Sequence, residues 1–239
     1  MRRLVLAGIA LCLAAGGAAL GWWLRKPEFN AQLYGQLRLV SVQAQLDEAK
    51  PGYILIAGDS QAEMHNPSGP LCGAEIVNAG TGGATAEAYA RLLPQLKLDP
   101  KPGAAILTIG SNDLNRKHKP NSEASARAFG EAVSRIVLLL QQATPRVVVT
   151  AVPPIGRSVG DRLDPSAVGP YSRVIREACE RLGCLYADPF AALRDGDSGF
   201  ALKGALRDGL HLARFRPVQA ALAPLLCGAG ENGPSTNVR

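Results

Sequence analysis

Short apolar runs alternate with longer amphipathic stretches along this chain, and the alternation predicts its secondary structure. Five short runs bounded by turn residues are typical of buried strands, at 53–57, 75–78, 104–109, 146–152 and 184–187. Four longer stretches have helical spacing, at 85–97, 122–142, 170–182 and 213–226. Strands that alternate with helices predict a parallel sheet covered on both faces. We therefore expect an α/β fold, a flavodoxin-like three-layer sandwich with a five-stranded parallel sheet.

The N-terminal stretch from Leu4 to Leu24 has 21 uncharged residues, enough to span a bilayer as one helix. Basic and aromatic residues flank it as interfacial anchors would: Arg2 and Arg3 before it, and Trp22, Trp23, Arg25 and Lys26 after it. A cleavable signal peptide is the alternative, with a weak cleavage site near Ala18. We favour an uncleaved signal anchor over residues 1–26, because the apolar run is longer than the apolar core of a usual signal peptide.

The rest of the chain predicts one domain with short flanking segments. Residues 27–50 read as a juxtamembrane helix or linker, because the apolar residues from Phe29 to Ala49 have roughly helical spacing. Pro51-Gly52 ends this segment, and a single domain is expected at 51–227. We expect residues 228–239 to form a disordered tail. No internal repeat and no second domain are predicted.

The net charge of +6 comes largely from the N-terminus. Residues 1–26 hold four basic and no acidic side chains, which leaves 26 − 4 = 22 basic against 20 acidic side chains, or +2, for the remainder. No basic run or basic stripe with interleaved aromatic residues is present, so we expect no nucleic-acid partner. A hydrophobic content of 47% with 19% charged residues excludes global disorder.

Cysteine usage gives a hint about the compartment. Cys12 lies inside the apolar stretch, and an even number lies outside it: Cys72, Cys179, Cys184 and Cys227. Four cysteines permit two disulfides in an oxidising compartment, with three possible pairings. Cys179 and Cys184 flank a predicted helix end and could be neighbours. Four buried free thiols are the alternative.

Four loops at predicted strand ends or near the C-terminus hold residues suited to acyl transfer. The first strand ends in Gly58-Asp59-Ser60, where Ser60 is a candidate nucleophile or only part of a helix cap. A hydroxyl needs a base beside it, and His211 could serve, with Asp208 orienting the imidazole. The turn ending at Gly83 could offer backbone N–H groups, and Asn112 could donate its amide to an oxyanion.

These four blocks, in this order, resemble the SGNH (GDSL) hydrolase family. The matching segments are Gly58-Asp59-Ser60, the turn from Asn78 to Gly83, Gly110-Ser111-Asn112-Asp113 and Asp208-Gly209-Leu210-His211. The resemblance covers residues 53–226. It implies Ser60 as nucleophile, His211 as base and Asp208 as its orienting group. It also implies an oxyanion hole from the N–H groups of Ser60 and Gly83 and the Asn112 side chain, with Gly80 and Gly82 as competing glycines. Gln61 departs from the family, where many members have Leu, and we expect it in the pocket wall.

The resemblance and the anchor together predict a membrane-anchored serine esterase. Its expected substrates are short-chain acyl esters, acetyl above all, on a carbohydrate or lipid, with the domain periplasmic or extracellular and secreted if 1–26 are cleaved. The alternative is a cell-envelope O-acyltransferase or a non-catalytic assembly protein on the same fold. His65 and His118 match no triad position and are expected at the surface or in loops. No cluster has metal-ligand spacing, so we expect no metal and no cofactor.

Overall fold

The computed structural model describes residues 16–17, 30–65, 67 and 69–227. The predicted membrane helix over 1–26 lies, except for two of its residues, outside these described residues, as does the predicted tail over 228–239. Among the residues that are described, none of the helices is both long and apolar enough to cross a membrane. Residues 31–239 form one compact unit, and the following description concerns the described part of it.

The sheet is parallel throughout and five-stranded, as expected from the sequence. Its strands are β1 (Ile54–Gly58), β2 (Ile76–Gly80), β3 (Ala104–Thr108), β4 (Val147–Thr150) and β5 (Leu185–Ala187). The order across the sheet is β2-β1-β3-β4-β5. This is the flavodoxin-like order, in which ligands bind outside the carboxyl ends of the strands.

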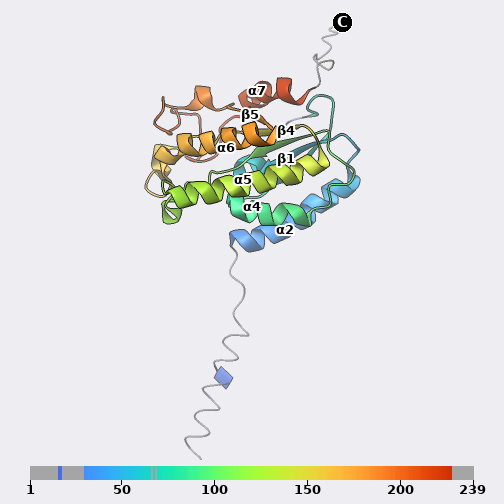
Figure 1. Ribbon diagram of the computed structural model, residues 1–239, viewed down its shortest axis with the longest axis horizontal. Helices are drawn as coiled ribbons and strands as arrows, with labels where there is room; N and C mark the ends of the chain where they lie inside the picture. Colours follow the sequence, from blue (N-terminus) through green and yellow to red (C-terminus); the bar gives the residue numbers. More distant parts are fainter. Residues whose placement is uncertain (1–15, 18–29, 66, 68, 228–239) are drawn as a thin grey trace, which may run out of the picture. The chain divides into compact units, whose positions relative to one another are not determined.

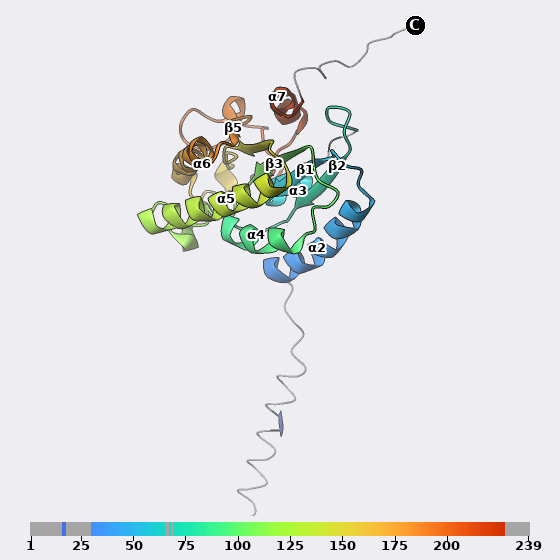
Figure 2. The ribbon, with the colours of Figure 1, turned by 45° about the vertical axis from the view of Figure 1, so that its right-hand side comes forward.

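Helices cover both faces of the sheet (Figures 1 and 2). One face carries α2 (Ala31–Glu48), α4 (Ala86–Leu92), α5 (Glu123–Ala143) and α6 (Val168–Leu182). The other carries the short α3 (Ser60–Met64) and α7 (Arg216–Leu226). Alternate residues of each strand enter the two cores: Leu55 packs with the first set of helices and Ile56 with the second. The three central strands, β1, β3 and β4, are buried throughout, which explains why they are continuous apolar runs in the sequence.

Helix α4 is shorter than the predicted helix at 85–97. It ends at Leu92 and continues as a 3₁₀ turn over Leu93–Gln95. The cause is Pro94, since proline has no N–H to donate and its ring clashes with the preceding turn of an α-helix. The remaining predicted elements differ from the observed ones by a few residues at their ends.

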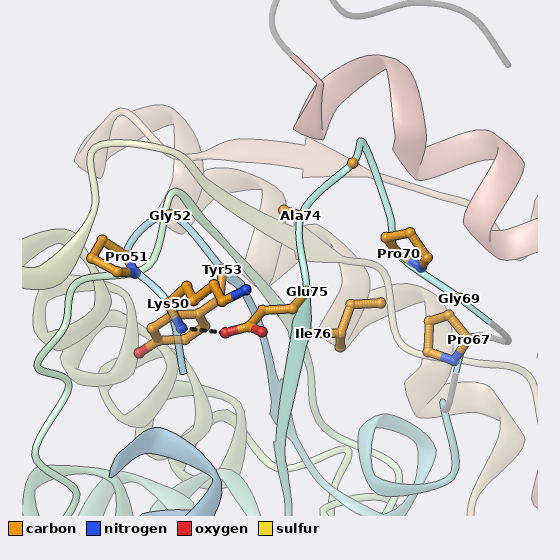
Figure 3. Close-up of a pocket in the computed structure, with 11 residues that line it drawn as sticks. Lys50, Pro51, Gly52, Tyr53, Pro67, Gly69, Pro70, Ala74, Glu75 and Ile76 are labelled. Atoms are coloured by element: carbon orange, nitrogen blue, oxygen red, sulfur yellow. Dashed lines mark hydrogen bonds between the residues drawn. The ribbon is translucent and has the colours of Figure 1, made fainter. Parts of the chain in front are cut away.

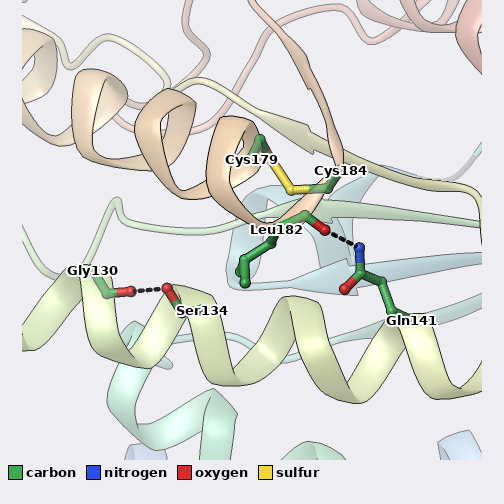
Figure 4. Close-up of a disulfide and its surroundings, with 6 residues drawn as sticks. All are labelled: Gly130, Ser134, Gln141, Cys179, Leu182 and Cys184. Carbon is green, nitrogen blue, oxygen red and sulfur yellow. Dashed lines mark hydrogen bonds between the residues drawn. A yellow bond between two sulfur atoms is a disulfide. The ribbon is translucent and has the colours of Figure 1, made fainter.

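Two disulfides join the four cysteines of the described chain. Cys179 and Cys184 link the end of α6 to the residue before β5, close to α5 (Figure 4). Cys72 and Cys227 link the loop before β2 to the residue after α7, 155 positions apart. A cross-link over so long a loop removes much conformational entropy from the unfolded chain. The second disulfide therefore fastens the last helix to the first half of the domain.

A hollow of about 580 Å³ lies at the amino ends of β1 and β2 (Figure 3). Its walls include Tyr53, just before β1, and Ile76, the first residue of β2. Ser60, by contrast, follows the carboxyl end of β1. The hollow is therefore at the wrong end of the sheet to serve the residues suited to acyl transfer.

Candidate active site

Ser60 is the first residue of α3, immediately after the buried Asp59. The Asp59 carboxylate accepts hydrogen bonds from the backbone N–H of Gln61 at 2.9 Å and of Ser111 at 3.0 Å. Complete burial raises the pKa of Asp59 to about 6, although these hydrogen bonds act in the opposite direction. Asp59 thus caps α3 and ties the β1 loop to the β3 loop, which fixes the position of Ser60.

His211 lies within hydrogen-bonding distance of both Ser60 and Asp208. Its Nε2 is 2.8 Å from the Ser60 Oγ, and its Nδ1 is 2.7 Å from Asp208 Oδ2. An ionised carboxylate can only accept, so Nδ1 carries the proton and Nε2 is left as the acceptor for the Ser60 hydroxyl. The structure therefore brings Ser60 to a histidine 151 positions further along the chain, in the arrangement that a nucleophile and its base require.

Asp208 holds the His211 loop as well as the imidazole. Its Oδ1 accepts from the backbone N–H of Leu210 at 2.9 Å and of His211 at 2.8 Å. Desolvation raises the pKa of Asp208, but the hydrogen bonds from His211 and Leu210 outweigh it and hold that pKa well below its usual range. Asp208 is therefore a carboxylate over the whole range in which esters are usually assayed.

Gln61 does not lie in a pocket wall, contrary to the expectation from the sequence. Its side chain is 1% exposed and bonds to the backbone on both sides of His211. Nε2 donates to the carbonyl oxygen of Leu210 at 2.6 Å, and Oε1 accepts from the N–H of Leu212 at 3.4 Å. The residue next to the nucleophile thus fastens the loop that carries the base. In the sequence, the only feature that indicates this role is the position of Gln61 next to Ser60.

The predicted oxyanion donors lie in the loops after β2 and β3. Gly83 has φ +74°, a left-handed conformation that favours glycine. The Asn112 Nδ2 donates to the carbonyl oxygen of Ala84 at 3.0 Å, which fixes the amide beside the Gly83 loop and leaves its second N–H. In the described part of the chain, the backbone N–H groups of Ser60 and Gly83 have no hydrogen-bond acceptor.

The two competing glycines, in contrast, have their N–H groups occupied. Gly80 donates to Asn78 Oδ1 at 2.9 Å, and Gly82 donates to Glu63 Oε2 at 2.6 Å. A side chain at Gly80 would also meet the backbone of Glu63, since an added Cβ would lie 2.1 Å from its nitrogen. Of the three glycines in this turn, Gly83 is the one whose amide is left to donate to a ligand.

Helix α2 braces the same turn through Glu63. The Glu63 carboxylate accepts from the Gly82 N–H and from the Tyr34 hydroxyl, and it lies 3.6 Å from the Arg38 guanidinium. Arg38 also donates to the carbonyl oxygen of Gly80 at 3.1 Å. These contacts connect residues of α2 with the one helical turn after Ser60. The sequence carries no motif that singles out Tyr34, Arg38 or Glu63.

Asp113 orders the start of α4, which matches the expectation that it serves its loop. Both carboxylate oxygens accept from the backbone N–H of Ala86, at 3.0 and 3.2 Å. Burial raises the pKa of Asp113 to about 7, the hydrogen bond from Ala86 lowers it, and the charge of nearby Asp59 raises it further. Asp113 thereby connects the Asn112 loop to the helix that follows Gly83.

The other two histidines take no part in this arrangement. His118 is exposed. His65 lies in the loop after α3, which is one of the two expected locations, but it is buried and stacks on the ring of Phe215 at 5.0 Å between centroids. Burial lowers the pKa of His65 to about 4 and keeps it neutral. Across the described residues, no group of three or more His, Cys, Asp or Glu side chains could hold a metal ion.

A hydroxyl, an imidazole and a carboxylate aligned at the carboxyl end of a parallel α/β sheet form the arrangement of a serine enzyme that transfers acyl groups. Residues 59–214 match the GDSL-like lipase/acylhydrolase family, and the chain belongs to this family. The match confirms the resemblance that the four sequence blocks indicate. It begins after α2.

Solved structures support the fold. A Streptococcus pneumonia protein is 18% identical, with 89% of this chain and 99% of that one covered and a TM-score of 0.69. A GDSL-like lipase from Bacteroides thetaiotaomicron is 14% identical, with 82% and 98% covered and a TM-score of 0.64. An acetylxylan esterase from Geobacillus stearothermophilus, a catalytic mutant, is 16% identical, with 78% and 99% covered and a TM-score of 0.57. No curated protein matches the chain.

Proposed function

We propose that this protein is a serine esterase that hydrolyses short-chain acyl esters, acetyl above all, on a carbohydrate or a lipid. The observation that carries the proposal is the hydrogen-bonded series from Ser60 Oγ through His211 to Asp208, with distances of 2.8 and 2.7 Å. The likeness in fold to an acetylxylan esterase supports the choice of acyl group.

In the first half of the reaction, Ser60 Oγ attacks the carbonyl carbon of the ester and its proton passes to His211 Nε2. Negative charge then develops on the carbonyl oxygen, where the N–H groups of Ser60 and Gly83 and the amide of Asn112 donate hydrogen bonds. The bond to the alcohol breaks, and His211 returns the proton to the departing oxygen. Asp208 stays ionised and stabilises the imidazolium throughout.

In the second half, water takes the place of the alcohol. It attacks the acyl-Ser60 carbonyl carbon and gives a proton to His211 Nε2, and a second tetrahedral oxyanion occupies the same donors. The bond to Ser60 Oγ breaks, His211 protonates this oxygen, and the carboxylic acid leaves. The enzyme returns to its starting state with no cofactor consumed.

We infer that the domain works outside the cytoplasm, held by an N-terminal membrane anchor over residues 1–26. Two disulfides support an oxidising compartment, and the apolar stretch from Leu4 to Leu24 supports the anchor. Protease treatment of cells stripped of any outer membrane, with the plasma membrane intact, tests this inference. A domain that is spared, and is digested only after the plasma membrane is lysed, would lie in the cytoplasm and contradict it.

The activity is tested on the full chain in detergent with p-nitrophenyl acetate, butyrate and decanoate. We expect acetate to be hydrolysed best, and Ser60→Ala and His211→Ala each to lower kcat by about a thousandfold or more. A fluorophosphonate probe should label the wild type at Ser60 and leave Ser60→Ala unlabelled. A folded wild type with neither turnover nor labelling would refute the proposal.

A further inference from the structure

A groove of about 440 Å³ runs between α2 and α4, which lie side by side in Figures 1 and 2. It begins at the oxyanion loop, because Gly83 and Ala84 line it. Gly83 supplies the free backbone N–H, and Ala84 holds the Asn112 amide through its carbonyl oxygen. A substrate whose carbonyl oxygen sits against these donors would therefore have the groove directly beside its reacting ester. The volume lies in the range of about 300–1,000 Å³ typical of small-molecule sites.

Side chains that form hydrogen bonds line the groove. Three glutamine side chains line it, Gln32 and Gln36 from α2 and Gln95 after α4. Each amide group both donates and accepts hydrogen bonds. Arg91, also in the wall, lies 2.7 Å from the Glu87 carboxylate, which pairs with Arg135 of α5 as well.

The apolar side chains of the lining are short, apart from one leucine. They belong to Ala31, Ala84, Ala88 and Leu92. None of the large exposed apolar side chains of the described chain lines the groove; these are Leu37, Val40, Met64, Leu138, Leu185 and Leu202. A pocket for a fatty acyl chain needs extended apolar walls, whereas amides over small side chains suit a ligand rich in hydroxyl groups.

We propose that the groove between α2 and α4 binds the saccharide that carries the ester, so that the substrate is an acylated carbohydrate and not a lipid. This rests on the proposed esterase function and narrows its substrate class. The family match begins at residue 59, so α2 and the two glutamines it contributes lie outside the segment that the family shares. The proposal thus assigns part of the saccharide specificity to a helix that precedes the matched segment.

The test compares two substrates that share an acetyl group and differ in the alcohol: acetylated xylo-oligosaccharides and p-nitrophenyl acetate. For Gln36→Ala we expect the ratio of kcat/KM for the saccharide to that for p-nitrophenyl acetate to fall about tenfold, mainly through KM. Ala88→Leu, which narrows the groove, should lower the same ratio. Gln142→Ala, an exposed-helix control in α5 and outside the groove, should leave both rates unchanged.

Binding to the Ser60→Ala protein separates this proposal from the esterase function. Calorimetric titration with xylotriose should detect binding that weakens about tenfold when Gln36→Ala is added. If p-nitrophenyl acetate is hydrolysed but the ratio and the binding are insensitive to Gln36, the groove proposal fails and the esterase stands. If binding follows Gln36 while no ester is hydrolysed, the esterase fails and the groove stands. Faster hydrolysis of p-nitrophenyl decanoate by Gln36→Leu would assign the groove to an acyl chain and overturn the proposal.

Discussion

Replacing Gln61 by leucine should disable the enzyme without unfolding it. Leucine has a similar size, so the buried site stays filled, but it can neither donate to the Leu210 carbonyl nor accept from the Leu212 N–H. A buried polar group left without a partner costs about 1–3 kcal/mol. Loss of the 2.6 Å bond to Leu210 carries the full cost, and loss of the 3.4 Å bond from Leu212 adds little. The substitution should therefore lower the free energy of unfolding by roughly 2 kcal/mol.

The two unpaired groups belong to the loop that carries His211. If this loop shifts, water can reach the Leu210 carbonyl and the Leu212 N–H and form the missing hydrogen bonds. A shift of about 1 Å between reacting groups can lower a rate by about a hundredfold. We therefore expect kcat for p-nitrophenyl acetate to fall about 30- to 100-fold with KM within about twofold, because the chemical step suffers and not the binding. The melting temperature should fall by only about 4–8 °C.

Steady-state kinetics and a thermal melt on the same preparations check both numbers. Gln142→Leu, the same substitution on the exposed surface of α5, is the matched control and should change neither quantity. A Gln61→Leu protein whose melting temperature drops while kcat stays within twofold of wild type would refute the reasoning. In that case Gln61 would be part of the packing alone, and His211 would be held by Asp208 without help.

Two further predictions concern the carboxylates around the site. For Asp113→Asn we expect higher stability than wild type at pH 8.5, by at most about 4 kcal/mol, and little difference below pH 4. Burial raises the pKa of Asp113 to about 7, so the stability that its neutral form provides is lost as pH rises through 7. Urea unfolding measures the free energy of unfolding of both proteins at the two pH values. An equal difference between variant and wild type at both pH values would contradict this prediction. For Glu63→Ala we expect kcat to fall about tenfold or more, with KM and the melting temperature little changed, because the Gly82 N–H and the Tyr34 hydroxyl lose their acceptor. Labelling by a fluorophosphonate should slow in parallel, and a variant as fast as the exposed-site control Glu131→Ala would exclude the brace.

The fold and the juxtaposition of the candidate triad follow from local features of the sequence. A short apolar run that ends in Gly58-Asp59-Ser60 has to be a buried strand with a residue at its carboxyl end, whatever the rest of the chain does. In a parallel sheet these ends share one edge, so the loops bearing Ser60 and Asn112 are neighbours by topology. His211 comes from a loop before the last helix, and its place beside Ser60 followed from the order of the blocks.

The contacts that position these groups could not be predicted in the same way. Gln61 meets a carbonyl 149 positions away, and Tyr34 meets Glu63 across 29 positions. Neither pair has a periodicity or a characteristic spacing, because each depends on how whole elements pack. The same holds for the disulfides: four cysteines allow three pairings, and only packing brings Cys72 to Cys227.

Helix α2 contacts the site from outside the segment that matches the family. The triad loops lie within the residues that match the family, so they account for ester chemistry but for nothing more specific. Helix α2 precedes that segment, yet Tyr34 and Arg38 brace the oxyanion turn and Gln36 lines the groove beside it. A fragment that begins at the Pro51-Gly52 turn would keep Ser60 and His211 and lose both the brace and one wall of the groove. Removal of α2 would therefore change the rate and the preference for the alcohol part of the ester. The fragment would still cleave an ester bond.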